Sequence, residues 1–151
     1  MNTISSDMEF RQALEALSLE QQRYVGARFV TNVLSLSEDA RLQQVVEAAT
    51  SEGDLESAFK IAKRASLEAH TRCGTEGDWN DQAGYFVARG VEAIVEPQIR
   101  TAGKNPAWKA AMQCRMARTC LASESDEDTH DLETGAQYQL LNDYLEKVNN
   151  P

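Results

Sequence analysis

The sequence has 151 residues, of which 42% are hydrophobic, so one domain can bury roughly two-thirds of its unfolded surface. No apolar run is long enough to span a bilayer, and the first ten residues lack the basic and apolar regions of a secretion signal. The formal net charge of −9 argues against general nucleic-acid binding, because an acidic protein repels the phosphate backbone. We expect a single domain over residues 1–151, located in the cytoplasm, without a membrane or nucleic-acid partner.

The charges are distributed unevenly along the chain. Residues 1–59 carry ten acidic and four basic side chains, residues 60–118 carry six and ten, and residues 119–151 carry eight and one. Such segregation can reserve a basic surface for an anionic partner. We expect instead that the acidic flanks fold against the basic middle, since exposed charge patterns usually reflect solvation and weak pairing.

Apolar residues recur with helical spacing through most of the chain, and the alternation typical of strands is not convincing anywhere. The pattern predicts a short helix over residues 7–16. A second helix begins at Ser18, whose hydroxyl forms a capping box with Gln21. Ser37 predicts the start of a third helix, because a small polar cap followed by two acids suits the positive end of the helix dipole.

The middle of the chain contains two longer helical patterns. The first follows a cap at Asp54 and ends at Gly74. The second opens at Asp78 and has the widest apolar stripe, which indicates a central helix with several neighbours. Glycine at position 90 would let a neighbouring helix approach closely, and Pro97 should end the helix because its ring clashes with the preceding turn.

The last third of the chain begins with a strong helix-start signal. Asn105 is a cap residue, and Pro106 occupies the first helical position. Residues 123–131 contain no apolar residue and predict an acidic flexible loop, followed by a last helix from about Asp131. The fold class is therefore all-α, a single compact bundle of about six to seven mostly antiparallel helices.

The break between the two middle helices is the best candidate site. It carries one of two histidines, one of three cysteines and one of two tryptophans, namely His70, Cys73 and Trp79. His70 could act as a base for a Cys73 nucleophile on spacing alone. However, Cys73 lies near a helix C-terminus, where the dipole disfavours a thiolate, and no third residue that would orient the histidine can be named.

The spacing of possible ligands argues against three kinds of metal site. His70 and Cys73 together with Cys114 and Cys120 would complete a zinc ligand set, but six residues along a helix turn through about 600°, so the last two cysteines point apart. A di-iron site needs two Glu-x-x-His motifs, and the chain has one, ending at His130. The acidic loop lacks the glycine and the last glutamate of a calcium-binding EF-hand loop. We expect no metal and no cofactor.

An anion site is better motivated. The helix start at Asp78 presents free backbone N–H groups, Arg72 precedes the turn, and Arg115 and Arg118 share a face of a later helix that could lie beside it. We treat these arginines as exposed binding residues.

Two alternatives to a site at this turn stay open. Asp78 and Asp81 would themselves cap the helix, and the arginines would then pair with Glu92 or Glu96. Trp79 and Trp108 each occupy the first turn of a helix, where they could cover the core or line one groove.

The function that these observations favour is that of a non-catalytic interaction protein: an adaptor, regulator or assembly factor. It would bind a protein partner through a helical surface around residues 70–90 and 106–120. The alternative is a small-molecule binding or catalytic protein that holds an anionic ligand near the 70–80 turn, with no catalytic residue assigned. The sequence leaves homo-oligomer formation open.

Overall fold

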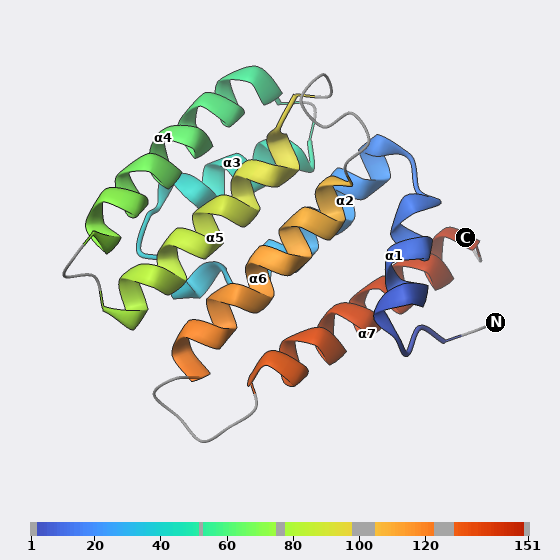
Figure 1. Cartoon of the computed structure of the whole chain (residues 1–151). Coiled ribbons are helices and arrows are strands. Elements are labelled where there is room, and N and C mark those ends of the chain that lie inside the picture. Colours follow the sequence, from blue (N-terminus) through green and yellow to red (C-terminus); the bar gives the residue numbers. More distant parts are fainter. Residues whose placement is uncertain (1–2, 52, 75–77, 98–104, 123–128, 150–151) are drawn as a thin grey trace.

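The computed structural model describes residues 3–51, 53–74, 78–97, 105–122 and 129–149, and in these residues it contains seven α-helices, one short 3₁₀ helix and no strand (Figure 1). The elements are α1 (Asp7–Glu15), α2 (Leu19–Thr31), η1 (Leu34–Leu36), α3 (Arg41–Ala49), α4 (Leu55–Cys73), α5 (Trp79–Val95), α6 (Pro106–Ala122) and α7 (Thr129–Asn149). The predicted all-α bundle is therefore confirmed. Within the described ranges, no helix is both long and apolar enough to cross a membrane.

The helices are arranged in two layers, and α5 contacts helices of both. Helices α4, α5, α6 and α7 lie side by side in one layer, with α2 and α3 behind them (Figure 1). Helix α5 contacts α2, α3, α4 and α6, as its wide apolar stripe predicts. Because α4, α5 and α6 alternate in direction, the end of α4, the start of α5 and the end of α6 lie at the same end of the bundle (Figure 1). We call this the lower end.

One hydrophobic core contains buried residues from all seven α-helices. Two glycines allow the central helices to approach each other closely. A Cβ atom at Gly26 would lie 2.7 Å from Cγ2 of Ile94, and one at Gly90 would lie 2.9 Å from Cγ1 of Val30. The close approach predicted for Gly90 is therefore present, and each glycine leaves room for a side chain of the facing helix, Ile94 of α5 or Val30 of α2.

The predicted caps lie where the sequence places them. Ser18 and Gln21 form both hydrogen bonds of the capping box, and Asp54 caps α4. The side-chain oxygen of Asn105 accepts hydrogen bonds from two backbone N–H groups at the start of α6. These interactions are local, so the residues nearest in sequence are sufficient to form them.

The third helix begins later than predicted, at Arg41 instead of Ser37. The Ser37 hydroxyl accepts the N–H of Asp39 at 3.1 Å, and the Asp39 carboxylate accepts the N–H of Arg41 at 3.0 Å. These short-range bonds hold residues 37–40 in a turn, because serine and aspartate side chains compete with helical hydrogen bonds. The prediction of a helix start at Ser37 is wrong for this reason.

The acidic loop is shorter than predicted. Helix α7 begins at Thr129, so residues 129–131 are helical and that part of the loop prediction is wrong. The remainder of the predicted loop, residues 123–128, lies outside the described residues.

Candidate functional site

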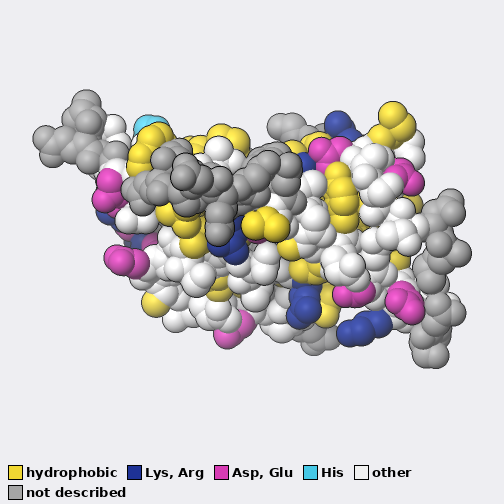
Figure 2. Space-filling view, turned by 90° about the horizontal axis from the view of Figure 1, so that it is seen from below, with side chains coloured by type: hydrophobic (Ala, Val, Ile, Leu, Met, Phe, Trp, Pro, Cys, Tyr) yellow, Lys and Arg dark blue, Asp and Glu magenta, His cyan; other side chains and the backbone are white. Residues whose placement is uncertain are grey.

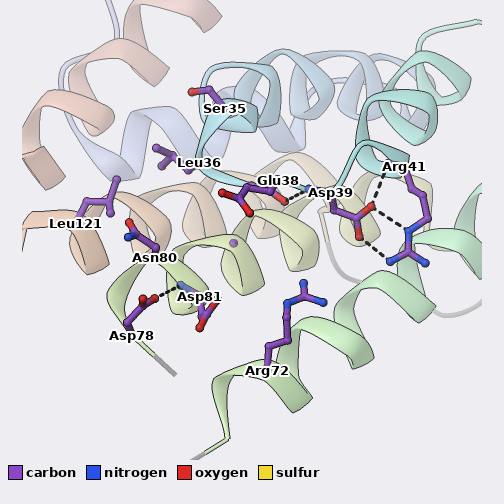
Figure 3. Close-up of a pocket in the computed structure, with 12 residues that line it drawn as sticks. Ser35, Leu36, Glu38, Asp39, Arg41, Arg72, Asp78, Asn80, Asp81 and Leu121 are labelled. Carbon is purple, nitrogen blue, oxygen red and sulfur yellow. Dashed lines mark hydrogen bonds and ion pairs between the residues drawn. The ribbon is translucent and has the colours of Figure 1, made fainter. Parts of the chain in front are cut away.

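A groove of about 840 Å³ lies at the lower end of the bundle (Figure 3). Its walls are residues 35–39 between α2 and α3, Arg41 at the start of α3, Arg72 at the end of α4, four residues at the start of α5 and its N-cap, and Leu121 at the end of α6. These four are the N-cap Asp78 and, within α5, Asn80, Asp81 and Gly84. We call this the polar groove. Its volume falls within the range of about 300–1,000 Å³ that is usual for ligand sites.

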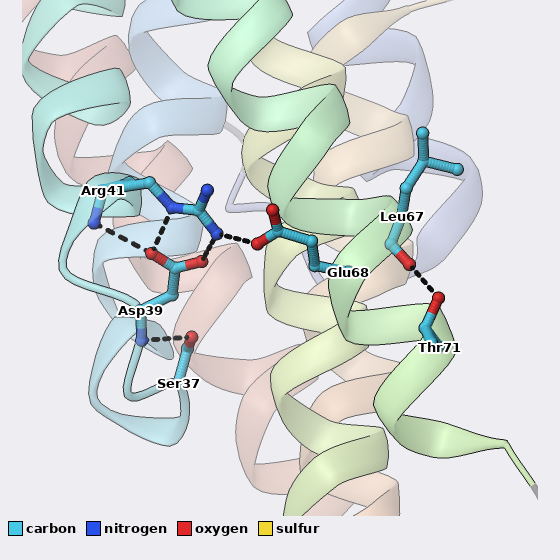
Figure 4. A network of polar contacts seen from close by, with 6 residues as sticks. All are labelled: Ser37, Asp39, Arg41, Leu67, Glu68 and Thr71. Carbon is cyan, nitrogen blue, oxygen red and sulfur yellow. Dashed lines mark hydrogen bonds and ion pairs between the residues drawn. The ribbon is translucent and has the colours of Figure 1, made fainter.

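An ion-pair cluster holds one wall of the polar groove in place (Figure 4). Arg41 Nη2 lies 2.7 Å from Oδ2 of Asp39 and 2.6 Å from Oε2 of Glu68 in α4. The hydrogen bond from Arg41 lowers the pKa of Asp39, and the two carboxylates raise the pKa of Arg41. The cluster therefore links the segment before α3 to Glu68 of α4, which precedes Arg72 by four residues.

The opposite wall is the start of α5, which lies against the end of α4. The Asp78 carboxylate caps α5 by accepting the N–H of Asp81 at 2.8 Å. The Cys73 thiol donates to the backbone oxygen of Asp81 at 3.3 Å. Burial raises the pKa of Cys73, and the negative charge of Asp81 raises it further. Cys73 is therefore a structural thiol at neutral pH, not an activated nucleophile.

His70 does not act on this thiol. Its side chain is exposed, and its ring centroid lies 5.6 Å from that of Tyr85. No hydrogen bond joins His70 to Cys73 among the described residues. The pairing of base and nucleophile that the spacing allowed is therefore not formed.

Three charged side chains of the polar groove have no hydrogen bond or ion pair with any other described residue: those of Glu38, Arg72 and Asp81. Arg72 extends from the end of α4 into the space between Asp39 and Asp81 (Figure 3). Acidic side chains are also visible at the left of the lower face of the molecule (Figure 2). The groove thus presents three charged side chains that form no hydrogen bond or ion pair with another described residue. At longer range, the positive charge of Arg72 contributes to lowering the pKa of Asp39.

Arg115 lies away from this groove, in the core. Its side chain is 5% exposed, its Nη2 lies 2.9 Å from Oδ1 of Asp7, and its Nε donates to Oε1 of Gln137 at 2.9 Å. The guanidinium also lies over the ring of Phe10, 5.5 Å from the centroid. The expectation that Arg115 is exposed is therefore wrong.

Arg118 also forms a structural ion pair. Its Nε lies 3.0 Å from Oε2 of Glu133, whose side chain is 2% exposed, and its Nη2 donates to the backbone oxygen of Asn32. It therefore links α6 to α7 and to the end of α2. The expectation that Arg118 is an exposed binding residue is also wrong, because the fold places the buried carboxylate of Glu133 beside it.

The alternative partners suggested for these arginines are wrong as well. Glu92 pairs with Arg89, and Glu96 pairs with Lys109 at 2.7 Å. The broader expectation, that acidic flanks neutralise part of the basic middle, is met by the pairs of α6 with Asp7 and Glu133.

The two tryptophans lie at opposite ends of the bundle, because α5 and α6 start at opposite ends (Figure 1). Trp79, next to two residues of the polar groove, is 42% exposed. Trp108 is partly buried beside Phe10, and the Arg11 guanidinium lies over its ring at 5.1 Å. Trp108 therefore covers the core beside α1, and the two side chains do not line one groove.

Arg72 and Asp78 were predicted from the sequence, whereas the opposite wall was not. Residues 75–77 of the predicted 70–80 turn lie outside the described residues. Glu38 was interpreted as part of a helix start, so residues 35–39 and Arg41 were not considered as site residues. Their signal in the sequence is the run of polar residues from Ser37 to Asp39 without an apolar position. Asn80 was missed because a polar residue in a first helical turn is common.

Among the described residues, no three His, Cys, Asp or Glu side chains lie close enough together to hold a metal ion. Comparison of the chain with protein families, curated proteins and solved structures found no match. The geometry and charge of the groove are therefore the basis for proposing a function.

Proposed function

We propose that this protein is a non-catalytic interaction protein, an adaptor, regulator or assembly factor, which binds a partner protein at the polar groove. The observation that carries this proposal is the set of charged side chains in the groove that form no hydrogen bond or ion pair with another described residue, those of Glu38, Arg72 and Asp81. Away from the groove the protein pairs such groups with each other, as in the Lys109–Glu96 and Arg118–Glu133 ion pairs. Charges left unpaired in a concave surface are suited to recognising a complementary partner.

The charge of the groove favours a basic segment of the partner. Four carboxylates line the groove, those of Glu38, Asp39, Asp78 and Asp81, against two guanidinium groups. One of these, Arg41, is already engaged by two carboxylates. A lysine or arginine side chain of the partner would therefore find Glu38 and Asp81 available, while Arg72 could pair with one acidic group beside it.

The surroundings of the groove also suit protein recognition. Trp79 lies between two lining residues in sequence and is 42% exposed, and aromatic side chains are enriched in protein interfaces. Of α6, by contrast, only Leu121 reaches the groove. The proposed surface is thus centred on residues 35–41 and 72–84 rather than on residues 106–120.

A small anionic ligand held by Arg72 is the second candidate. The unpaired guanidinium in the groove favours it. Because Arg115 and Arg118 are engaged elsewhere, Arg72 would be the main positive charge available to such a ligand, and four carboxylates would oppose it.

Site-specific crosslinking tests the proposal. A photoreactive residue at Asn80, which is exposed in the groove, should crosslink one partner in the native cell at a lysine- or arginine-containing segment. The variant Glu38→Gln/Asp81→Asn should lose the crosslink. The variant Glu15→Gln/Glu47→Gln removes two exposed carboxylates outside the groove and should keep it. A crosslink that persists in the groove variant, or that maps to an acidic segment, would refute the proposal. Loss of ligand binding only in Arg72→Gln would favour the anionic ligand.

A further inference from the structure

A second, smaller cavity lies between α4, α5 and α6 and shares no lining residue with the polar groove. Its volume is about 250 Å³. The charged side chains that line it are Lys63 of α4, Arg89 and Glu92 of α5, Glu96 just after α5, and Lys109 of α6, and Gln113 of α6 adds an amide. Three helices thus direct polar groups of both charges into one small space.

Two hydrogen-bond acceptors in this cavity lack a donor. The Glu92 side chain is 16% exposed, and the nearest cationic atom, Nη1 of Arg89, lies 3.7 Å away. That distance is longer than a hydrogen bond of about 2.7–3.2 Å. The side-chain oxygen of Gln113 is buried and has no hydrogen-bond partner. Burial raises the pKa of Glu92, as expected for a carboxylate that is poorly compensated.

The cavity also has an unpaired cation at its edge. Lys109 is engaged by Glu96 at 2.7 Å. The exposed Lys63 ammonium, in contrast, forms no ion pair or hydrogen bond with another described residue. The cavity therefore combines acceptors that receive no hydrogen bond from another described residue with the exposed Lys63 ammonium group, which attracts Glu92 at longer range and can also meet an anion. Polar groups left unsatisfied in the interior are costly, and they usually have a partner such as water or a ligand.

We infer that this cavity binds a small zwitterion of the free α-amino acid class. The ligand ammonium group donates to Glu92, and the ligand carboxylate pairs with Lys63. A cavity of about 150 Å³ is large enough to hold benzene, so the observed space accommodates a small amino acid. This site is independent of the partner groove proposed above.

Binding of free amino acids to the full chain tests this inference. Each of the common L-amino acids is titrated into the purified protein and followed by calorimetry, and the tightest ligand is compared with its N-acetyl and methyl ester derivatives. We expect saturable one-to-one binding that both modifications weaken at least tenfold. Failure of every amino acid to bind at millimolar concentration would show that water fills the cavity and would overturn the inference. Equal binding of the N-acetyl derivative would show a simple anion site and would overturn it too.

Three variants locate the ligand. Glu92→Gln should weaken binding at least tenfold, and Lys63→Gln severalfold. Lys60→Gln, on the same helix but outside the cavity, should bind like the native protein. If Glu92→Gln melts at a much lower temperature, the exposed Lys63 still decides the matter, since its replacement leaves the fold intact. Unchanged affinity in Lys63→Gln would refute the proposed site. The groove variant Glu38→Gln/Asp81→Asn should bind the amino acid normally, which separates this site from the partner groove.

Discussion

Two clusters of charge in this protein have opposite relations to the fold. Arg115 and Arg118 of α6 are paired with Asp7 and Glu133, and these pairs tie α1 and α7 to the bundle. In the polar groove, Arg72 and two carboxylates form no hydrogen bond or ion pair with another described residue, and Arg72 acts on Asp39 only at longer range. The residue types are the same in both clusters, but among the described residues only the first cluster is neutralised by ion pairs.

The difference shows what an arginine can contribute in each setting. A guanidinium that meets a buried carboxylate supports the fold, because removing it would strand the opposite charge away from water. A guanidinium at the edge of a groove adds little to stability and is available to a ligand. The two clusters should therefore respond differently to the same substitution.

The largest effect is expected for Arg118→Gln. It leaves the carboxylate of Glu133, whose side chain is 2% exposed, without its ion pair, so the free energy of unfolding should fall by about 3 kcal/mol or more. Urea denaturation at pH 7 measures this change. The double variant Arg118→Gln/Glu133→Gln should recover most of the loss, since no charge is then stranded. A loss below about 1 kcal/mol would remove the distinction between the clusters.

Asp39→Asn should have an intermediate effect, because this residue lies in the groove wall yet is paired. Replacing it weakens charge-assisted bonds to Arg41, at an expected loss of about 1–2 kcal/mol at pH 7. The pKa of Asp39 is lowered in the folded protein, so its stabilisation is present above the unfolded pKa of about 4 and is lost as the pH falls through the lower folded pKa. The stabilities of the native protein and the variant should converge at acidic pH. A constant difference down to pH 2 would contradict this assignment.

A smaller effect is expected for Tyr138→Phe in the buried cluster. The hydroxyl donates to Asp7 at 2.7 Å, so its loss should lower the free energy of unfolding by about 1 kcal/mol or less. Burial and the interaction with Asp7 raise the pKa of Tyr138 to about 12. A raised pKa means that this stabilisation is complete below the unfolded pKa of about 10 and declines from there to about 12. Alkaline denaturation curves of the two proteins should therefore approach each other over this interval. Parallel curves would count against the role given to the hydroxyl.

Arg72→Gln should have the smallest effect on stability. Its guanidinium has no described partner to lose, so the free energy of unfolding should change by less than about 0.5 kcal/mol. Thermal and urea denaturation measure this beside Arg118→Gln, which makes the same chemical change in the paired cluster. A loss of 2 kcal/mol or more would show that Arg72 supports the fold and that the groove is not a binding surface.

The helices and most of their ends could be predicted from the sequence. Ser18 with Gln21, Asp78, and Asn105 with Pro106 act on backbone groups within three residues, so the local sequence contains the whole interaction. The predicted helix start at Ser37 is wrong, although a serine followed by two acids is typical of a helix start. The Asp39 carboxylate accepts the backbone N–H of Arg41 within the turn, and the Arg41 side chain also pairs with Glu68 of another helix. Two residues of the candidate site, Arg72 and Asp78, were also predictable, since residues 70–80 combine unusual residue types in one short segment.

The set of helices, their caps and their apolar stripes can be read from the sequence alone, because periodicity and capping depend on neighbours a few residues apart. The tertiary structure decided which charges are buried and which are free. Arg115 meets Asp7 across 108 positions of the chain, and Arg118 meets a carboxylate of α7, while Arg72 meets no described partner. The same side chain therefore serves stability or recognition according to the distant residue that folding brings beside it. That encounter depends on how the helices pack, which is not visible in the spacing of residues along any one of them.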